Sequence, residues 1–194
     1  AMPFDSVISF SISTEAFESF NATSISSALL GMFTTSFIAL SSSSLNFKGE
    51  KREMTILFSD IRGFTSLSES LEPEELTRIL NGYLSAMTPS ILEEKGTIDK
   101  FIGDAIMEFC NAPLFVNNHT THAVRAALCM INALEIFNRK NKTTLAVGIG
   151  LHVGTVIVGN VGSQERVNYT ILGDAVNLAS RIESMTKEYG TDFL

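Results

Sequence analysis

The chain has 194 residues, 45% of them hydrophobic and 18% charged, which is enough for one sizeable domain with a buried core and an extension. Its formal net charge of −7 argues against the basic surface on which non-specific nucleic-acid binding depends, so we predict no nucleic-acid partner. Cys110 and Cys129 have neither metal-ligand nor disulfide-framework spacing, which favours two reduced thiols in a cytoplasmic protein.

Residues 1–47 form a serine-rich segment whose composition differs from the rest of the chain. It has no charged residue between Glu18 and Lys48. Its most apolar part, residues 28–40, is shorter than the roughly 20 apolar residues that a membrane-spanning helix needs. We interpret it first as a packing or dimerisation segment, with a membrane segment and a signal peptide as the second and third alternatives. The sequence leaves its role and any membrane attachment open.

From residue 48 onward the sequence alternates between strand and helix patterns. Period-two alternation and short apolar runs predict strands at 54–60, 145–154, 155–162 and 167–171, and a hairpin at 97–111. Apolar residues at helical spacing predict helices at 72–87, 122–137 and 174–190, the last with Asp174 as its N-cap. This order predicts an α/β (α+β) fold with a mostly antiparallel sheet flanked by helices.

Two aspartates occupy glycine-containing connections beside apolar strands. Asp60 ends the strand at 54–60, and Asp104 lies in the hairpin connection after Gly103. If the strand and the hairpin are neighbours, the two carboxylates meet at one end of the sheet. Two carboxylates with open positions suit Mg²⁺ or Mn²⁺, which prefer oxygen ligands and leave room for phosphates. Alternatively, each is an ordinary turn residue.

Three further polar residues have two interpretations each. Strand parity places Lys100 on the side of Ile98 and Ile102, where its amine extends to solvent or finds a partner. Asn177 and Arg181 fall together on the polar side of the last predicted helix, either as a solvated face or facing a partner or a phosphate. The opposite, apolar side of that helix is predicted to consist of Ala175, Leu178, Ala179, Ile182 and Met185.

Four segments, in order along the chain, resemble the catalytic domain of class III nucleotidyl cyclases. They are ILFSDIRGFTSLSE, TIDKFIGDAIMEFCNAP, GIGLHVGTVIVGNVGS and VNYTILGDAVNLASRIE. Agreement of four ordered blocks is more specific than any single motif. The resemblance implies a cyclase catalytic domain at 48–194 with a ferredoxin-like core, and it does not cover residues 1–47. It also implies further C-terminal strands, including a lysine that contacts the triphosphate, which have no counterpart among the printed residues.

The resemblance implies an adenylyl cyclase reaction and a set of site residues. The ribose 3′-hydroxyl of ATP attacks the α-phosphorus, giving 3′,5′-cyclic AMP and pyrophosphate. Asp60 and Asp104 match the two metal-binding aspartates, and the backbone carbonyl of Ile61 matches a further ligand of two Mg²⁺ or Mn²⁺ ions. The other matched positions are Lys100 and Thr170 for the base, Asn177 for the ribose and Arg181 for charge on the reacting phosphate.

The two base positions favour ATP. Lysine donates to the unprotonated N1 of adenine, whereas guanine has a protonated N1 that a carboxylate accepts better. Guanylyl members of the family tend to carry Glu and Cys where this chain has Lys100 and Thr170. The threonine resembles a subgroup in which some members respond to bicarbonate.

In this family the site lies across a head-to-tail dimer. The resemblance therefore implies a homodimer in which Asp60 and Asp104 come from one subunit, while Lys100, Thr170 and the helix residues come from the other. The alternatives are a catalytically silent dimerisation module and a guanylyl cyclase. We expect a cytoplasmic catalytic domain, with a membrane-attached parent protein as an open possibility.

Overall fold

The computed structural model describes residues 49–163 and 165–194, so the serine-rich segment 1–47 lies outside the described residues. The described part is a mixed α+β fold built on a five-stranded sheet in the order β2-β3-β1-β4-β5, in which all paired strands are antiparallel. This confirms the predicted fold class. The elements in chain order are β1 (Glu50–Ile61), α3 (Phe64–Ser70), α4 (Pro73–Glu93), β2 (Thr97–Ile102), β3 (Ala105–Cys110), α5 (His119–Asn141), β4 (Val147–Gly162), β5 (Val167–Leu172) and α6 (Asp174–Tyr189).

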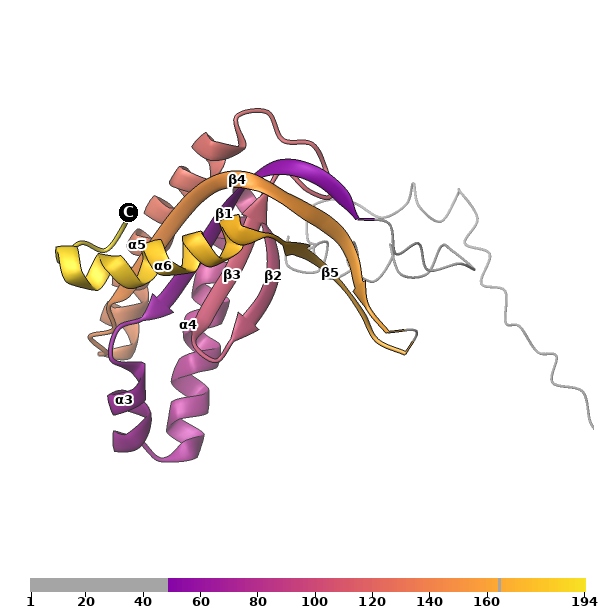
Figure 1. The fold of residues 1–194 in the computed structure, drawn as a ribbon. Helices are drawn as coiled ribbons and strands as arrows, with labels where there is room; N and C mark the ends of the chain where they lie inside the picture. The colour runs from indigo at the N-terminus through magenta and orange to yellow at the C-terminus, as the bar shows by residue number, and fades with distance from the viewer. Residues whose placement is uncertain (1–48, 164) are drawn as a thin grey trace, which may run out of the picture.

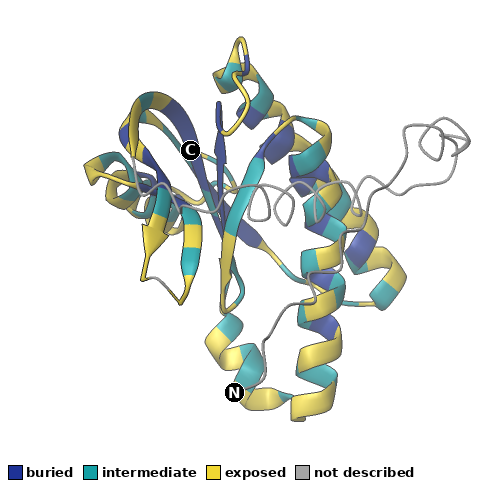
Figure 2. Cartoon of the chain, turned by 90° about the vertical axis from the view of Figure 1, so that its right-hand side faces the viewer, coloured by how far each residue is buried: buried dark blue, intermediate teal, exposed yellow. Residues whose placement is uncertain are grey.

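Both faces of the sheet are covered in its centre, where Figure 2 shows the buried strands between the helices. Helices α4 and α5 pack together and form one apolar cluster with β1 and its neighbours, centred on Leu57, Tyr83 and Met130. A second cluster on the other face includes Ile56 and Ala179 of α6. Because successive residues of β1 point to opposite faces, covering both faces explains why its central stretch is a continuous apolar run.

Helix α6 lies unusually close to β4. A Cβ atom at Gly150 would be 2.2 Å from the backbone nitrogen of Glu183 and 2.8 Å from the carbonyl oxygen of Ala179. No side chain fits at that distance, so glycine is required for this approach. The contact fixes the helix that carries Asn177 and Arg181 against the sheet.

Strand β4 is one long element rather than the two strands predicted at 145–154 and 155–162. It pairs with β1 from Val147 to Val158 and with β5 from Ile157 to Gly162. Figure 1 shows that it arches over the molecule, so that β5 comes beside β2 although these are the two edges of the sheet. The division at residue 154 was wrong because no turn residue pair interrupts the alternation there.

Three details of the helices also differ from prediction. Helix α3 was not predicted, because its seven residues are mostly polar and too few to show a clear period. In α6, Asp174 is the first helical residue and Gly173 precedes it as the N-cap. Leu178 and Met185, predicted on the apolar side of α6, are each 39% exposed, because the row facing β4 runs through Ala179 and Thr186 instead.

Within the described residues, no helix combines the length and the apolar character needed to cross a membrane.

Candidate active site

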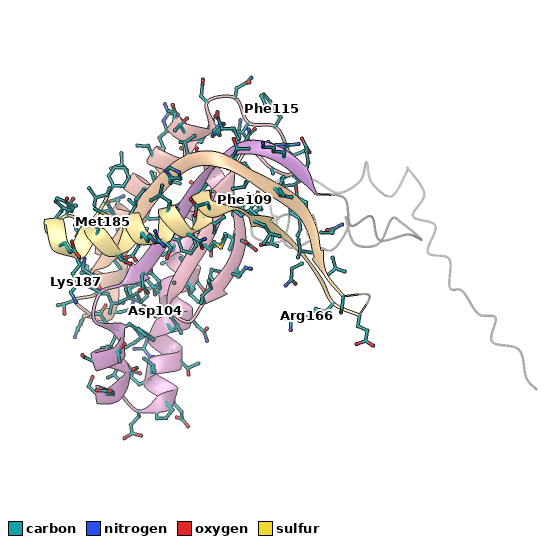
Figure 3. The ribbon with its side chains drawn as sticks, viewed as in Figure 1. Asp104, Phe109, Phe115, Arg166, Met185 and Lys187 are labelled. Atoms are coloured by element: carbon teal, nitrogen blue, oxygen red, sulfur yellow. The ribbon has the colours of Figure 1, made fainter. Side chains whose placement is uncertain are left out.

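The first cluster of predicted site residues lies where β1 ends. Both carboxylates accept a hydrogen bond from the backbone N–H of Ile61, through Oδ1 of Asp60 and Oδ2 of Asp104, each at 3.1 Å. Asp104 reaches this position from the connection between β2 and β3, where Gly103 has a φ of 65° (Figure 3). Two aspartates 44 positions apart in the chain therefore meet at one end of the sheet, as predicted for neighbouring strands, and they share one backbone donor.

The charge at this corner is concentrated. Burial, together with the contact and the charge of Asp104 and the charge of Glu183, raises the pKa of Asp60 from 3.8 to about 7. Crowded carboxylates repel each other when both are ionised, and a nearby cation relieves that repulsion. A surface cleft of about 270 Å³ opens beside them, lined by Asp60, Ile61, Arg62, Gly63, Glu183, Ser184 and Lys187.

The donor set at β1 fits a divalent cation with an open coordination shell. In the described part of the chain, no group of three or more His, Cys, Asp or Glu side chains is arranged to hold a metal by itself. Asp60 and Asp104 supply oxygen ligands only, which suits hard cations that keep other positions for water or phosphate. The two carboxylates would therefore supply part of a coordination sphere, and a ligand or water would supply the rest.

The second cluster joins the edge strands β2 and β5. The Nζ atom of Lys100 lies 3.5 Å from Oγ1 of Thr170, so the structure brings the two predicted base-site residues together within one chain. The Lys100 side chain is 43% exposed, which leaves its amine accessible to a ligand.

The prediction that Ile98 and Lys100 point to the same face of β2 was wrong, because a β-bulge lies between them. Ile98 lies opposite Glu108. Lys100 lies opposite Met107, the adjacent residue on β3, whose side chain points to the other face. Lys100 therefore shares a face with Ile102, as predicted, but not with Ile98. The bulge turns the lysine toward β5.

Asp99 is a member of this cluster that sequence reasoning missed. Its side chain is only 1% exposed, and its Oδ2 accepts a hydrogen bond of 2.6 Å from Oγ1 of Thr170. The Nζ atom of Lys100 lies 3.6 Å from its other carboxylate oxygen. Burial raises the pKa of Asp99, while the Thr170 hydrogen bond and the charge of Lys100 oppose that rise. The only available indication was an acidic residue directly before the lysine.

Asn177 and Arg181 lie one turn apart on the exposed side of α6. Among the described residues, neither side chain makes a hydrogen bond or an ion pair with another side chain. Within one chain the structure thus does not bring them into contact with the aspartates or with the Lys100–Thr170 pair.

Arg62 is a second residue that the sequence analysis left without a role. Its guanidinium donates to Oγ1 of Thr186 at 3.2 Å and to the carbonyl oxygens of Val147 and Thr191. It therefore links the end of β1, two positions after Asp60, to the last turn of α6. Arginine suits this role because its planar fork carries several donors that stay charged.

Comparison with known proteins identifies the family of the chain. Residues 47–190 match the family described as "Adenylate and Guanylate cyclase catalytic domain". The chain belongs to this cyclase family. The resemblance found in the sequence is thereby confirmed. Two similar catalytic domains, 30% and 29% identical to this chain, have been solved in complex with ATPalphaS and with GTP, respectively.

Similar proteins include both adenylyl and guanylyl cyclases. An adenylate cyclase of Anabaena cylindrica is 51% identical over 151 residues, which are 74% of this chain and 29% of that protein. The crystal structure of the guanylyl cyclase Cya2 is 43% identical with a TM-score of 0.68, over 70% of this chain and 71% of that one. For the adenylyl cyclase CyaB from P. aeruginosa the identity is 40% and the TM-score 0.68, over 71% and 74% of the two chains. The chain spans less than a third of the length of the curated relatives it matches.

Proposed function

We propose that residues 48–194 form the catalytic domain of an adenylyl cyclase, which converts ATP to 3′,5′-cyclic AMP and pyrophosphate. The observation that carries this proposal is the presence of two separate clusters in one cyclase fold. One is the carboxylate pair that shares the Ile61 N–H, and the other is the Lys100–Thr170 pair. The first suits a metal-bound triphosphate, and the second suits a purine.

In this proposal Asp60, Asp104 and the carbonyl oxygen of Ile61 hold two Mg²⁺ or Mn²⁺ ions. When bound, such ions lower the pKa of the attacking ribose hydroxyl and neutralise charge on the triphosphate. The chain contributes rigidity, because both carboxylates are held by a backbone donor at the end of a strand buried in the sheet.

The base site supports ATP over GTP. The ammonium group of Lys100 only donates hydrogen bonds, so it complements the unprotonated N1 of adenine and opposes the protonated N1 of guanine. Overall similarity also supports ATP, because three curated relatives named adenylate cyclase are 51%, 40% and 42% identical to this chain. A guanylyl cyclase of known structure is 43% identical, so Lys100 and Thr170 supply the argument at the level of single residues.

We further propose that a second copy of the chain completes each site. Asn177 and Arg181 are exposed, which leaves them available to the triphosphate bound at the partner's carboxylates. Apolar side chains next to the base site are exposed as well: Ile157 and Leu172, which face each other across β4 and β5, are 50% and 48% exposed. Exposed apolar residues in a cluster are typical of a protein interface.

The test is cyclic nucleotide production by the purified chain with Mn²⁺ and either ATP or GTP, compared with Asp60→Asn. We expect cyclic AMP from ATP, less product from GTP, and loss of both in the variant. Equal, negligible product from the wild type and the variant would instead favour the silent dimerisation module. Preferential cyclic GMP formation would favour a guanylyl cyclase.

A further inference from the structure

Asp99 lies at the point where the two edge strands of the sheet meet. It sits at the bulge of β2, and the residue it contacts, Thr170, is on β5 at the opposite end of the strand order. A carboxylate whose side chain is 1% exposed is unusual, because burying a charge is costly unless it is paired and hydrogen-bonded. Here the partners are the Thr170 hydroxyl at 2.6 Å and the Lys100 amine at 3.6 Å.

The direction of the hydrogen bond between Asp99 and Thr170 is determined by chemistry. An ionised carboxylate has no hydrogen to donate, so the threonine hydroxyl must be the donor. A hydroxyl has one hydrogen, and once it points at Asp99 only lone pairs remain toward the solvent side. Thr170 is then restricted to accepting a hydrogen bond from a ligand, while Lys100 beside it only donates.

We propose that Asp99 sets this polarity and thereby acts as a positioning residue for nucleotide specificity. The inference rests on the proposed function, because a base must bind at Lys100 and Thr170 for the polarity to matter. Adenine presents a donor, its 6-amino group, next to an acceptor, N1, which complements an acceptor at Thr170 and a donor at Lys100. Guanine presents an acceptor, O6, next to a donor, N1–H, so both contacts become repulsive in the same pose.

Without the Asp99 carboxylate, the hydroxyl of Thr170 is free to rotate and donate to O6 of guanine. One of the two repulsive contacts is then removed. Asp99→Ala and Asp99→Val, which leave no acceptor at residue 99, are therefore expected to lower the ratio of kcat/KM for ATP to that for GTP by about three- to tenfold, the range of a single hydrogen bond. Most of the change is expected as a lower KM for GTP, whereas a purely structural role would lower kcat for both nucleotides alike.

A double-mutant cycle with Thr170→Val shows whether Asp99 acts through Thr170. Valine has the shape of threonine but no hydroxyl, so Asp99→Ala is expected to leave the nucleotide ratio unchanged in that background. Glu69→Gln is the matched control, because Glu69 is exposed on α3 and also loses one negative charge. It is expected to leave the ratio as in the wild type, and melting temperatures establish that each variant is folded.

The outcomes separate this inference from the proposed function. A wild type that makes no cyclic nucleotide overturns the proposed function. An active wild type whose ATP/GTP ratio is unchanged in folded Asp99→Ala or Asp99→Val overturns the role of Asp99. If neither variant folds, NMR of the wild type decides: we expect a slowly exchanging Thr170 hydroxyl proton that is missing from Thr170→Val, and its absence from the wild type overturns the inference.

Discussion

Asp60 and Asp104 accept hydrogen bonds from the same backbone donor, the N–H of Ile61, at 3.1 Å each. One strand end therefore orients two carboxylates from separate connections before any ligand arrives. Preorganisation of this kind is what a cation-binding corner requires, because flexible ligands lose affinity when they are ordered on binding.

The first prediction concerns metal binding. Mn²⁺ without nucleotide is expected to raise the melting temperature of the wild type, since a ligand at 100 times its Kd stabilises the folded state by about 2.7 kcal/mol. Asp60→Asn and Asp104→Asn are expected to abolish most of this rise, because each removes one of the two carboxylates. Differential scanning fluorimetry at increasing Mn²⁺ measures it, with Glu69→Gln as the control. An equal rise in all four proteins would show that the ion binds elsewhere.

The second prediction concerns Lys100. Lys100→Glu replaces a donor with an acceptor, so it is expected to lower the ratio of kcat/KM for ATP to that for GTP by about tenfold or more. Lys100→Gln, which can both donate and accept, is expected to fall between the wild type and the glutamate variant. Steady-state kinetics with both nucleotides measure the ratio. If the ratio stays constant across the series, Lys100 does not contact the base.

The third prediction concerns the dimer. Asp60→Asn and Arg181→Ala are each expected to be inactive alone, and mixing them is expected to restore about a quarter of wild-type activity. Random pairing makes half of the dimers mixed, and each mixed dimer has one intact site of two, if the aspartate and the arginine come from different subunits. Cyclic AMP production measures the recovery. Should the mixture stay inactive while sizing shows mixed dimers, each site lies within one subunit.

The fourth prediction concerns a buried acid outside both clusters. Burial raises the pKa of Glu108 from 4.5 to about 8, with only a long contact to Sγ of Cys110 opposing it. The folded state therefore binds more protons than the unfolded state between these pH values, so the free energy of unfolding falls as pH rises through this window. The slope from this one group is at most about 1.4 kcal/mol per pH unit.

Glu108→Gln cannot titrate, so its stability relative to the wild type is expected to increase steadily from pH 5.5 to 8. Urea denaturation of both proteins at each pH measures the difference, and groups that titrate in both proteins cancel. A difference that does not change with pH would show that Glu108 has an ordinary pKa in the fold.

The fold was predictable where a local pattern is strong. The central run of β1 and the helical spacing of α4 and α5 led to the correct elements, because both faces of that strand and one side of each helix are buried. The continuous course of β4 follows from alternation that no turn pair interrupts, and dividing it was an error of interpretation. The bulge in β2 was not predictable, because it depends on how the sheet twists, which alternation along a single strand does not encode.

The candidate site was also predictable only in part. The pairing of Asp60 with Asp104 follows from two strands being neighbours, so sequence reasoning anticipated it. The contact between Asp99 and Thr170 depends on the arch of β4, which brings opposite edges of the sheet together. Leu178 was misplaced because an apolar residue was assumed to face the sheet, whereas Ala179 is the residue of α6 that packs against β4 in the narrow gap beside Gly150.

That narrow gap has a consequence for how this protein can be altered. The spacing between β4 and α6 is determined by main-chain atoms at Gly150, not by a layer of side chains whose sizes can be exchanged. Any larger residue there would push the whole helix outward and carry Asn177 and Arg181 with it. Substitutions on the outer surface of α6 are free of this constraint, whereas residue 150 cannot be enlarged without displacing the helix.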